Sequence, residues 1–548
     1  MIDERGLGCW TFRTCPWHAS AVRIPARTVP DKGRRFLGMT IETLLAATPA
    51  LHGVAQVLGD AAVPIRDITY DSRTAGPGSL FVALRGAAFD GHRFIGTAID
   101  RGAAAILAEG PVADPRARCV VVVPDSRAAL AQVAATFYGE PSHELGLIGV
   151  TGTKGKTTTS FLIEAILGQV VATGLIGTVD LKVGPRRWRN PVHQTTPESL
   201  DVQCLLREMV AERVEWAILE TSSHALVNHR VERCAYDIAV ITNVTHEHLD
   251  FHGTYENYLA AKGELLARIA PPATKGRQWS RGAIINRDDP GAASLLGRTV
   301  GAPEWTYGLS AEADIRATEI TANEGDLAFL LTSPWGACRI QTPLLGRFNV
   351  YNILAAAGAC LLAGLSPETV ARGLAVFAGV SGRVQRIEAG QPFLAVVDFA
   401  HNADSLAQIL TLLRGVTAGK LVAVFGSAGE RDVAKRAQMG AVCAHHADAA
   451  IFTDEDPRGE ESLAILREIA AGAERAGWRA GREYECVPDR RAAIERAIAG
   501  AAPGDTILLA GKGHENTMVY ADRTIPWDEA AEVRRALAAR GYGGGKHE

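Results

Sequence analysis

Residues 151–157, Thr-Gly-Thr-Lys-Gly-Lys-Thr, form the segment whose composition points most directly to chemistry. Its two glycines allow backbone N–H groups to approach phosphate oxygens, and a helix beginning here adds the positive end of its dipole. Lys156 can reach the β- and γ-phosphates of a nucleotide, and the Thr157 hydroxyl can ligate Mg²⁺. We therefore predict an ATP site at Thr151, Gly152, Thr153, Lys154, Gly155, Lys156, Thr157 and Thr158.

The residues around this segment match the strand–loop–helix arrangement that a phosphate loop requires. A strand-like apolar run, 145–150, precedes it, and a helix-like run, 157–168, follows it. Val150 stands where loops of this kind usually begin with glycine. The segment predicts nucleotide binding, but it leaves the reaction open.

Other apolar runs end in turns that carry glycine or acidic residues. Two lie at 216–220 and 238–244, and four more lie at 393–400, 421–429, 449–456 and 506–513. Near-continuous hydrophobicity is typical of parallel strands buried on both faces of a sheet. Ligand sites of open α/β sheets lie at the carboxyl ends of such strands, so we expect the functional loops there.

The chain of 548 residues is too long for one hydrophobic core, and its alternating elements predict an α/β protein of three domains. We expect a small N-terminal α/β domain at 39–141, a central P-loop domain with a mostly parallel sheet at 142–381, and a Rossmann-like C-terminal domain at 382–548. Residues 1–38 have no apolar run typical of a secretory signal. They are predicted to be a disordered extension or a wrongly assigned start, with Met39 as the true first residue.

The composition excludes several classes of protein. The net charge of −4 gives no basic excess that would indicate a nucleic-acid partner. No apolar run reaches the roughly 18–20 residues that cross a bilayer, so membrane insertion is not expected. The nine cysteines are odd in number and lack paired CxxC spacing, which argues against a disulfide framework or a zinc site and fits the reducing cytoplasm.

Seven motifs, in this order, resemble those of the Mur ligase family. They are GTKGKTTT (152–159), LETSSHAL (219–226), NVTHEHLDFHGTYENYLAAK (243–262), DFAHNADSL (398–406), GSAGERD (426–432), DEDPR (454–458) and GKGHE (511–515). Within that family the chain is most similar to the member that adds a diamino acid to UDP-N-acetylmuramoyl-L-Ala-D-Glu. The resemblance runs from about residue 67 to the C-terminus.

The resemblance implies an ATP- and Mg²⁺-dependent ligase of peptidoglycan precursor synthesis, expected to be a monomer. In this family the γ-phosphate of ATP passes to the D-Glu carboxylate, and an amine then attacks the acyl phosphate. Phosphoryl transfer onto an anion depends mainly on charge neutralisation. The N-terminal domain is then the UDP-sugar-binding domain, and the C-terminal domain binds the amino acid.

Three residues acquire catalytic or metal-binding roles from the resemblance, besides Lys156 and Thr157. Glu220 and His248 match metal contacts, although either residue considered alone would more often be solvated. Lys262 matches a lysine that CO₂ carbamylates, which turns a cation into an anion able to bind Mg²⁺. On its own residues, LAAKGELL, Lys262 is predicted to be a solvated helix lysine.

The resemblance also implies contacts to the UDP-sugar and to the nucleotide. Ser72 and Arg73 match UDP-sugar contacts, with Gly86 and His92 as neighbours. The contacts expected for the muramoyl dipeptide are Thr195, Thr196, Ser222, Arg230 and Lys262. Those expected around the adenine, ribose and phosphates are Asn349, Arg383, Asp398 and His401.

The incoming amine is expected to meet Arg431, Asp456, Arg458, Gly511 and Glu515. Family members that use meso-diaminopimelate usually carry Asp-Asn-Pro-Arg, whereas this chain has Glu455-Asp456-Pro457-Arg458. Arg458 favours a substrate carboxylate, as in diaminopimelate, and Asp456 favours an ammonium, as in lysine or ornithine. Alternatively, Asp456 pairs with Arg458. The sequence leaves the amine open.

Two other functions are compatible with the phosphate loop. A folylpolyglutamate synthase-like ligase shares the acyl-phosphate chemistry, but DEDPR, GKGHE and the N-terminal YDSR segment argue against it. A nucleotide-dependent switch that performs no ligation would bind or hydrolyse ATP regardless of the dipeptide. Phosphate release measured with and without each substrate separates these functions.

Overall fold

The computed structural model describes residues 39–543 except 87–89, 193 and 323–326. The predicted extension at 1–38 lies outside these residues. Within the described part the chain forms two compact units that meet in the sequence at Val380 and Ser381. Among the described residues, no helix combines the length and apolar character that crossing a bilayer requires.

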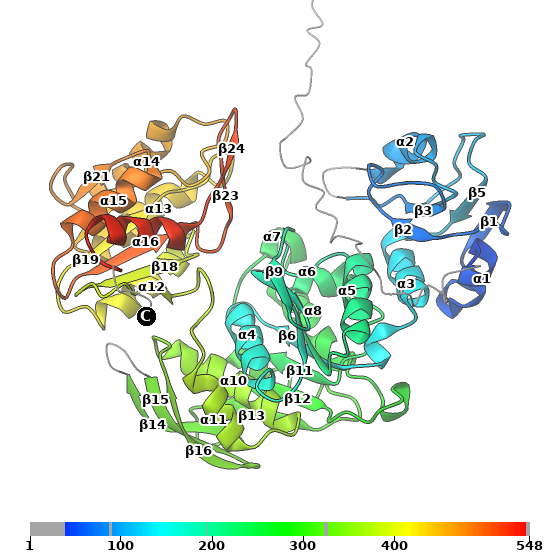
Figure 1. Ribbon diagram of the computed structural model, residues 1–548, viewed down its shortest axis with the longest axis horizontal. Coiled ribbons are helices and arrows are strands. Elements are labelled where there is room, and N and C mark those ends of the chain that lie inside the picture. Colours follow the sequence, from blue (N-terminus) through cyan, green and yellow to red (C-terminus); the bar gives the residue numbers. More distant parts are fainter. Residues whose placement is uncertain (1–38, 87–89, 193, 323–326, 544–548) are drawn as a thin grey trace, which may run out of the picture. The chain divides into compact units, whose positions relative to one another are not determined.

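The N-terminal part of the first unit is built on a five-stranded sheet in the order β1-β5-β4-β3-β2, drawn in blue in Figure 1. Only β1 is antiparallel to its neighbour. Its strands and helices are α1 (Ile41–Ala46), η3 (Pro49–Leu51), β1 (Gln56–Gly59), β2 (Asp67–Thr69), β3 (Ser79–Val82), η4 (Gly91–Phe94), α2 (Ile95–Asp100), β4 (Ala105–Ala108), β5 (Cys119–Val122) and α3 (Ser126–Tyr138).

The rest of the first unit contains an eleven-stranded sheet in the order β16-β15-β14-β13-β12-β11-β6-β10-β7-β8-β9. The strands from β14 to β7 are parallel, and antiparallel strands extend both ends. The strands are β6 (Gly146–Thr151), β7 (Thr173–Ile176), β8 (Asp180–Val183), β9 (Arg186–Arg189), β10 (Trp216–Glu220), β11 (Ile238–Ile241), β12 (Gly282–Asn286), β13 (Glu304–Gly308), β14 (Ile315–Ala322), β15 (Leu327–Ser333) and β16 (Gly336–Thr342).

Helices cover both faces of this sheet because its central strands are apolar on both sides. Ile148 and Val150 of β6 share a core with α4, α10 and α11, whereas Gly149 faces Leu265 of α8. The helices are η5 (Pro141–His143), α4 (Lys156–Leu167), α5 (Ser199–Ala211), α6 (Ser223–Val227), α7 (Leu249–His252), α8 (Tyr255–Ala267), η6 (Pro272–Thr274), α9 (Pro290–Ala293), α10 (Phe348–Leu362) and α11 (Pro367–Ala375).

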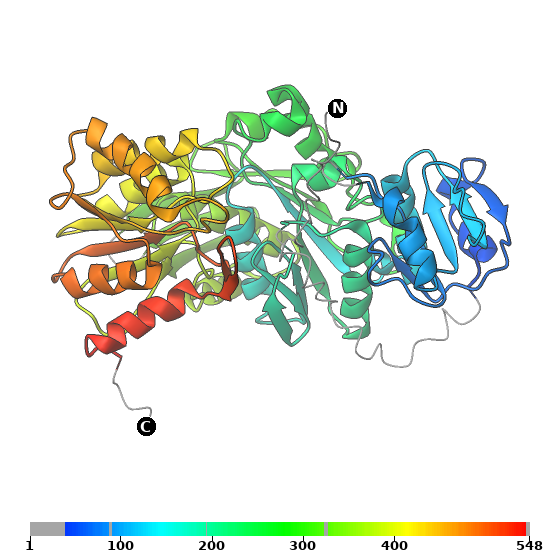
Figure 2. The same ribbon diagram turned by 90° about the horizontal axis from the view of Figure 1, so that it is seen from above.

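The second unit is a Rossmann-like α/β sheet in the order β17-β18-β22-β19-β20-β21, parallel except for β17. Helices α12, α13 and α14 pack on one face and α15 and α16 on the other, and Figure 2 shows the red α16 opposite the yellow helices. Its elements are β17 (Gln385–Arg386), β18 (Leu394–Asp398), α12 (Ala403–Arg414), β19 (Leu421–Phe425), α13 (Ala434–His446), β20 (Ala449–Phe452), α14 (Ser462–Arg475), β21 (Tyr484–Cys486), α15 (Arg490–Gly500), β22 (Thr506–Ala510), β23 (Thr517–Val519), β24 (Thr524–Pro526) and α16 (Glu529–Ala539).

The predicted fold class is confirmed: the described residues form an α/β protein with three large sheets, among them a mostly parallel central sheet and a Rossmann-like C-terminal sheet, and β23 and β24 pair in a fourth, two-stranded sheet. All six apolar runs named as strands form strands β10, β11, β18, β19, β20 and β22. The predicted functional loops follow the carboxyl ends of β6, β10, β18, β19, β20 and β22, where parallel strands place ligand sites.

Candidate active site

The phosphate-loop segment joins β6 to α4, as predicted. Lys156 begins α4, and its Nζ donates to the carbonyl oxygens of Gly152 and Thr153, both at 2.9 Å. Val150, which stands in the usual glycine position, is a buried residue of β6, paired with Glu220 of β10 and Val240 of β11. A β-branched residue fits there because this position is a central strand position and not part of the turn.

Both glycines of the loop are required by their surroundings. Gly152 and Gly155 have φ values of 150° and 84°. A Cβ on Gly152 would lie 1.8 Å from Thr242 Oγ1, and one on Gly155 would lie 2.4 Å from Asn352 Oδ1. The loop therefore keeps its backbone close to the two neighbouring segments only because it carries no side chain at these points.

Glu220 lies directly beside the loop, at the end of the strand that pairs with β6. Its Oε2 accepts a hydrogen bond from Thr157 Oγ1 at 2.9 Å, and Thr178 donates to Oε1 from its N–H at 3.0 Å and to Oε2 from its hydroxyl at 2.9 Å. The side chain is fully buried, and burial raises the pKa of its carboxyl. No ion pair of Glu220 occurs among the described residues.

Lys262 of α8 also points at the loop, so it is not the solvated helix lysine that its local sequence alone suggests. Its side chain is 1% exposed, and Nζ donates to the Gly152 carbonyl oxygen at 2.7 Å. Nζ also lies 4.5 Å from the centre of the Tyr258 ring. Burial, followed by the nearby charge of Lys156, places the pKa of Lys262 well below its ordinary value.

His248 stands immediately before α7 in a left-handed conformation, with φ 55°. Its ring lies 4.8 Å from that of His224 and 6.3 Å from that of Tyr258, measured between ring centres. Tyr258 in turn contacts Lys262, so one aromatic ring joins the surroundings of His248 and Lys262. His248 is about half exposed.

Glu220 and Thr157 suit a magnesium ion. Mg²⁺ prefers oxygen ligands, and it is usually held by one or two carboxylates together with substrate phosphates. A buried carboxylate that forms no ion pair in the described part of the chain, in contact with the hydroxyl of the phosphate loop, offers such a site. Among the described residues no group of three or more His, Cys, Asp or Glu side chains could hold a metal alone, so phosphate oxygens have to complete the ligand set.

Three of the predicted dipeptide contacts lie together behind Glu220. Thr196 Oγ1 donates to the Glu220 carbonyl oxygen at 2.7 Å and contacts Ser222 Oγ at 3.3 Å. Arg230 Nη1 donates to the Thr196 carbonyl oxygen at 3.1 Å. Thr195 is half-buried beside them. These residues form one cluster of hydroxyls and a guanidinium beside Glu220, and their role in binding the dipeptide stays a prediction.

Glu198 links this cluster to the N-terminal sheet, a role that its sequence context does not predict. Its Oε1 lies 2.9 Å from Arg230 Nε and 3.0 Å from Arg127 Nη1 of α3. Arg127 Nη2 donates to the Arg85 carbonyl oxygen at 3.3 Å. The pattern TTPES shows Glu198 only as the residue before a helix, because its partners are distant in the sequence.

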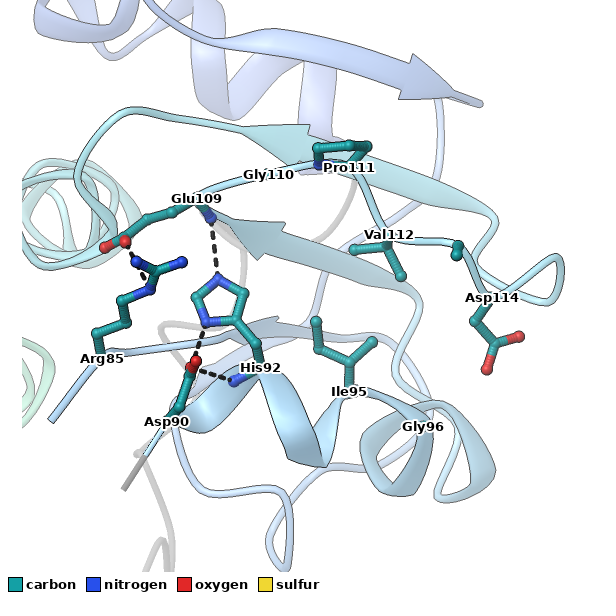
Figure 3. Close-up of a pocket in the computed structure, with 11 residues that line it drawn as sticks. Arg85, Asp90, His92, Ile95, Gly96, Glu109, Gly110, Pro111, Val112 and Asp114 are labelled. Carbon is teal, nitrogen blue, oxygen red and sulfur yellow. Dashed lines mark hydrogen bonds and ion pairs between the residues drawn. The ribbon is translucent and has the colours of Figure 1, made fainter. Parts of the chain in front are cut away.

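The N-terminal sheet carries a cavity of about 390 Å³, shown in Figure 3. His92 crosses it: Nδ1 lies 2.6 Å from Asp90 Oδ1, and Nε2 accepts from the Glu109 N–H at 3.1 Å. Arg85 Nε lies 3.1 Å from Glu109 Oε2. Gly86, another predicted neighbour, is not among the cavity's lining residues.

The predicted residues Ser72 and Arg73 do not line this cavity. They belong to the turn after β2, where Ser72 is buried. Arg73 Nη2 lies 2.7 Å from Asp71 Oδ2. The structure thus groups His92 with the cavity and leaves Ser72 and Arg73 in a separate turn.

Asn349, at the start of α10, is buried and accepts a hydrogen bond from Asn352 Nδ2 at 2.8 Å. Asn352 Oδ1 faces Gly155, and Asn243 Oδ1 accepts from the Lys154 N–H at 2.9 Å. Asn352 and Asn243 therefore contact and support the phosphate loop, although neither was predicted to belong to the site. The spacing of two asparagines in RFNVYN was the available signal.

The other three predicted nucleotide residues gather in the C-terminal unit around Phe399. The Arg383 guanidinium lies 4.7 Å from the Phe399 ring centre, and the His401 ring lies 4.7 Å from the same ring. Asp398 accepts hydrogen bonds from the N–H groups of Val384 and Ala400, each at 2.8 Å. Burial raises the pKa of the Asp398 carboxyl and lowers that of His401.

Four of the five predicted amine-binding residues meet at the ends of β20 and β22. Asp456 Oδ1 accepts from Lys512 Nζ at 2.8 Å, and Lys512 Nζ also donates to Glu515 Oε2 at 2.6 Å. Asp456 therefore pairs with Lys512 and not with Arg458, which corrects the alternative pairing considered from sequence. Gly511 approaches Glu455, since a Cβ there would lie 2.2 Å from Glu455 Oε2. Arg458 completes this group.

Arg431, the fifth, is exposed on the loop after β19. Gly429 of the same loop donates its N–H to the Asp456 carbonyl oxygen at 3.0 Å, which brings the loop beside the group. Glu455 was also missed by sequence reasoning, although it is fully buried and its Oε2 has no hydrogen-bond partner among the described residues.

The chain combines a phosphate loop, a buried carboxylate and a buried lysine on a mostly parallel sheet, and a Rossmann-like unit follows this sheet. This combination defines a class of nucleotide-dependent enzymes. Family models match the chain in three parts: "Mur ligase family, catalytic domain" at 64–138, "Mur ligase middle domain" at 150–360, and "Mur ligase, glutamate ligase domain" at 382–513. The chain belongs to the Mur ligase family.

Individual relatives are similar over most of their length. UDP-N-acetylmuramyl-tripeptide synthetase of Roseiflexus sp. (strain RS-1) is 47% identical over 488 residues, which cover 88% of this chain and 96% of that protein. UDP-N-acetylmuramoyl-L-alanyl-D-glutamate–2,6-diaminopimelate ligase of Geobacillus kaustophilus (strain HTA426) is 45% identical, covering 86% and 94%. A solved structure of such a diaminopimelate ligase aligns with a TM-score of 0.63 at 30% identity, covering 92% of this chain and 100% of the other.

Proposed function

We propose that this chain is an ATP-dependent ligase of the cytoplasm that adds a diamino acid to the D-Glu carboxylate of UDP-N-acetylmuramoyl-L-Ala-D-Glu. The product is a muramoyl tripeptide, a precursor of peptidoglycan. The observation that carries the proposal is the convergence of Lys156, Glu220 and Lys262 on one phosphate loop. The substrates follow from the motifs and from the names of the similar proteins.

The chemistry proposed for the loop is transfer of the γ-phosphoryl group to a carboxylate. Both partners are anions, so the protein's main task is to offset negative charge and to align the reacting oxygen. Lys156 and the N–H groups at the start of α4 supply positive charge. Thr157, Glu220, His248 and a carbamylated Lys262 would hold Mg²⁺, which would supply further positive charge to offset that of the phosphates.

The dipeptide is proposed to lie along Thr196, Ser222 and Arg230. Arg230 can bind a carboxylate with two parallel hydrogen bonds, and the hydroxyls can hold the remaining oxygens. The cluster adjoins the Glu220 backbone, so a carboxylate held there lies near the metal ligands. The uridine end is assigned to the N-terminal sheet, with His92, Ser72 and Arg73 as contacts.

The resulting acyl phosphate is attacked by the amine nitrogen, with loss of phosphate. Arg431, Asp456, Arg458, Gly511 and Glu515 are assigned to the amino acid, and Asn349, Arg383, Asp398 and His401 to the adenosine part of ATP. The relatives named for 2,6-diaminopimelate favour that amine over lysine or ornithine. Arg458, whose buried Nε has no hydrogen-bond partner within the described ranges, supports the same choice.

Phosphate release and product mass test the proposal together. The purified full chain is given ATP and Mg²⁺ alone, then the UDP-muramoyl dipeptide, then meso-diaminopimelate, L-lysine or L-ornithine. A ligase releases phosphate rapidly only with all three substrates, and mass spectrometry shows the tripeptide. A Lys156→Ala variant should lose at least about a hundredfold in rate, since a preorganised charge on the transferred group is removed. Lys420→Ala, an exposed lysine of the C-terminal unit, is the control.

Two outcomes would replace the proposal. Rapid ATP hydrolysis that ignores the dipeptide would identify a nucleotide switch. Phosphate release that requires a folate and glutamate, with none from the muramoyl dipeptide, would identify a folylpolyglutamate synthase-like ligase. Full activity of Lys156→Ala would remove the phosphate loop from the reaction.

A further inference from the structure

Three charged side chains meet at the ends of β20 and β22, and two of them, Asp456 and Glu515, are among the residues assigned to the incoming amine. Lys512 has no exposed surface, Asp456 is 6% exposed, and the Glu515 side chain is 27% exposed. Lys512 Nζ donates to Asp456 Oδ1 at 2.8 Å and to Glu515 Oε2 at 2.6 Å, and Asp456 Oδ1 also accepts from the Val519 N–H at 3.0 Å. Asp456, Lys512 and Glu515 are called the charged triad below.

Lys512 keeps its charge inside this triad. Burial alone would favour the neutral amine, but the carboxylates of Glu515 and Asp456 outweigh it, and the pKa of Lys512 lies above its ordinary value. The charge of Asp456 is therefore offset within the protein. Since Asp456 Oδ1 already accepts two hydrogen bonds, a substrate ammonium would have to enter beside another cation to use this carboxylate.

Arg458, two residues further on, is in the opposite situation. Its guanidinium forms no hydrogen bond or ion pair among the described residues, and its Nε is buried without a partner. The backbone fixes its position, because the Arg458 N–H donates to the Val519 carbonyl oxygen at 3.0 Å. A buried donor of this kind is costly unless a ligand completes it, and a carboxylate matches a guanidinium best.

Glu455, on the other side of Asp456, adds no charge that would cancel Arg458. Its carboxyl is buried, and burial raises its pKa to about 8, so it is mostly neutral near pH 7. The three positions of the charged triad carry a net charge of −1, from two carboxylates and one ammonium. With asparagine at position 456 the same three positions would carry no net charge.

We propose that Lys512 determines which amine this chain accepts. By pairing with Asp456 it lets an aspartate occupy the position where asparagine is usual, while Arg458 remains open to a carboxylate at the distal end of the incoming amino acid. Lys512 acts as a positioning residue, through its partners, and it need not touch the substrate. The inference rests on the proposed function and specifies how its amine is chosen.

The test is the ratio of kcat/KM for meso-diaminopimelate to kcat/KM for L-lysine, measured on the full chain with ATP and the UDP-muramoyl dipeptide. The variants are Lys512→Met, Asp456→Asn and the double variant. The triad then carries −2 in Lys512→Met, 0 in Asp456→Asn, and −1 in both the wild type and the double variant. A more negative triad is expected to lower the ratio of diaminopimelate to lysine, and a less negative triad is expected to keep or raise it.

In numbers, the wild type should prefer diaminopimelate, and Lys512→Met should lower the ratio at least tenfold. Asp456→Asn should keep or raise the ratio, and the double variant should return to within threefold of the wild type. The double variant also protects the test against misfolding of Lys512→Met, because it leaves no unpaired aspartate in the protein interior. A thermal melt verifies that each variant is folded.

Lys275→Met is the matched control. Lys275 is likewise a buried lysine in an ion pair, with Asp237, and it belongs to the first unit, whereas the residues assigned to the amine belong to the second. Its loss should lower stability without changing the amine ratio. The inference is overturned if the wild type prefers lysine, if Lys512→Met lowers both rates equally, or if the double variant prefers lysine. Absence of tripeptide with every amine in the wild type would instead refute the proposed function.

Discussion

Two lysines reach the same carbonyl oxygen, that of Gly152, from different helices and with different surroundings. Lys156 Nζ is 2.9 Å from it and Lys262 Nζ is 2.7 Å from it. Lys156 is partly exposed at the start of its helix, as suits a cation that binds phosphate. Lys262 is buried, and burial, together with the nearby charge of Lys156, lowers its pKa well below the ordinary value of a lysine. The neutral amine that carbamylation requires is therefore formed more readily at Lys262 than on an ordinary lysine.

We predict that Lys262 reacts reversibly with CO₂ and that activity depends on this reaction. In buffer freed of CO₂ the rate of tripeptide formation should fall at least about tenfold, and bicarbonate should restore it, because an anion near the metal replaces a cation. Carbon-13 NMR with labelled bicarbonate should show a carbamate that is absent from Lys262→Ala. A rate independent of CO₂, with no carbamate signal, would contradict the assignment.

Glu455 should make stability depend on pH. Its carboxyl has an ordinary pKa of 4.5, which burial raises to about 8. The folded protein thus holds this proton more tightly than the unfolded chain, so the stabilising effect is complete below about pH 4.5 and is lost as pH rises toward 8. Relative to Glu455→Gln, the wild type should lose up to about 1.4 kcal/mol of unfolding free energy per pH unit in this window.

Urea unfolding of both proteins between pH 5 and pH 8 measures this difference. Glu42→Gln, at an exposed position of α1, is the control and should run parallel to the wild type. Parallel curves for the wild type and Glu455→Gln would mean that Glu455 does not hold its proton in the folded state.

The sequence located the phosphate loop between β6 and α4, because the spacing of its residues is local, whereas only the resemblance to the Mur ligase family pointed to Glu220 and Lys262. It could not show that Lys262 is buried, since LAAKGELL resembles a solvated helix and only the packing of α8 against β6 reveals the direction of the side chain. The Asp456–Lys512 pair could not be predicted for a related reason. The two residues lie 56 positions apart in the sequence and meet only at the ends of separate strands.

At the scale of elements, the strands most easily predicted were those with continuous apolar runs. The antiparallel strands at both ends of the central sheet were not predicted, because β9 is mostly exposed and β16 alternates polar with apolar residues. Such strands face solvent on one side and carry a weak pattern. The loops that carry chemistry follow the buried parallel strands, so their location was predictable even though their contacts were not.

Helix α3 of the N-terminal sheet and helix α5 beside the central sheet are tied together by Glu198. It stands at the start of α5 and pairs with both Arg127 and Arg230. Tyr70 adds a second link, since its hydroxyl donates to Asp201 Oδ2 at 2.6 Å. The position of Arg230 relative to the N-terminal sheet is therefore fixed by charge as well as by packing.

We predict that Glu198→Gln raises KM for the UDP-muramoyl dipeptide about tenfold, or about 1.4 kcal/mol, because Arg230 loses its charged partner. KM for ATP should change little. Steady-state kinetics with each substrate varied in turn measure both effects. Glu208→Gln on the same helix is the matched control, because Glu208 pairs only with the half-exposed Arg186 among the described residues. Equal changes in both KM values would indicate general damage instead.

At the scale of the whole molecule, three sheets divide the proposed tasks. The N-terminal sheet carries the His92 cavity, the central sheet carries the phosphate loop, and the C-terminal sheet carries the charged triad. Each site lies at loops that follow parallel strands, so one structural rule, applied three times, accounts for all of them. The three sheets follow one another along the chain, and the motifs therefore occur in the order of the sheets that carry them.

The fold of the described chain begins at Met39 and Thr40. The Met39 carbonyl oxygen accepts from the Ile65 N–H at 2.8 Å, and the Thr40 hydroxyl caps α1 by accepting from the Thr43 N–H. Ile41 and Leu44 enter the core of the N-terminal sheet with no exposed surface. These contacts supply the first helix with its cap and its buried face.

We therefore predict that a chain beginning at Met39 keeps its melting temperature within about 2 °C and its rate of tripeptide formation within about twofold of the full chain. A further deletion to Leu44 removes the cap and Ile41, and it should lower the stability of the N-terminal sheet by about 2–4 kcal/mol. Calorimetry and phosphate release on the three chains measure both effects. If the Met39 chain lost activity while remaining folded, residues 1–38 would have a role in catalysis or substrate binding, and the prediction that they are dispensable would be wrong.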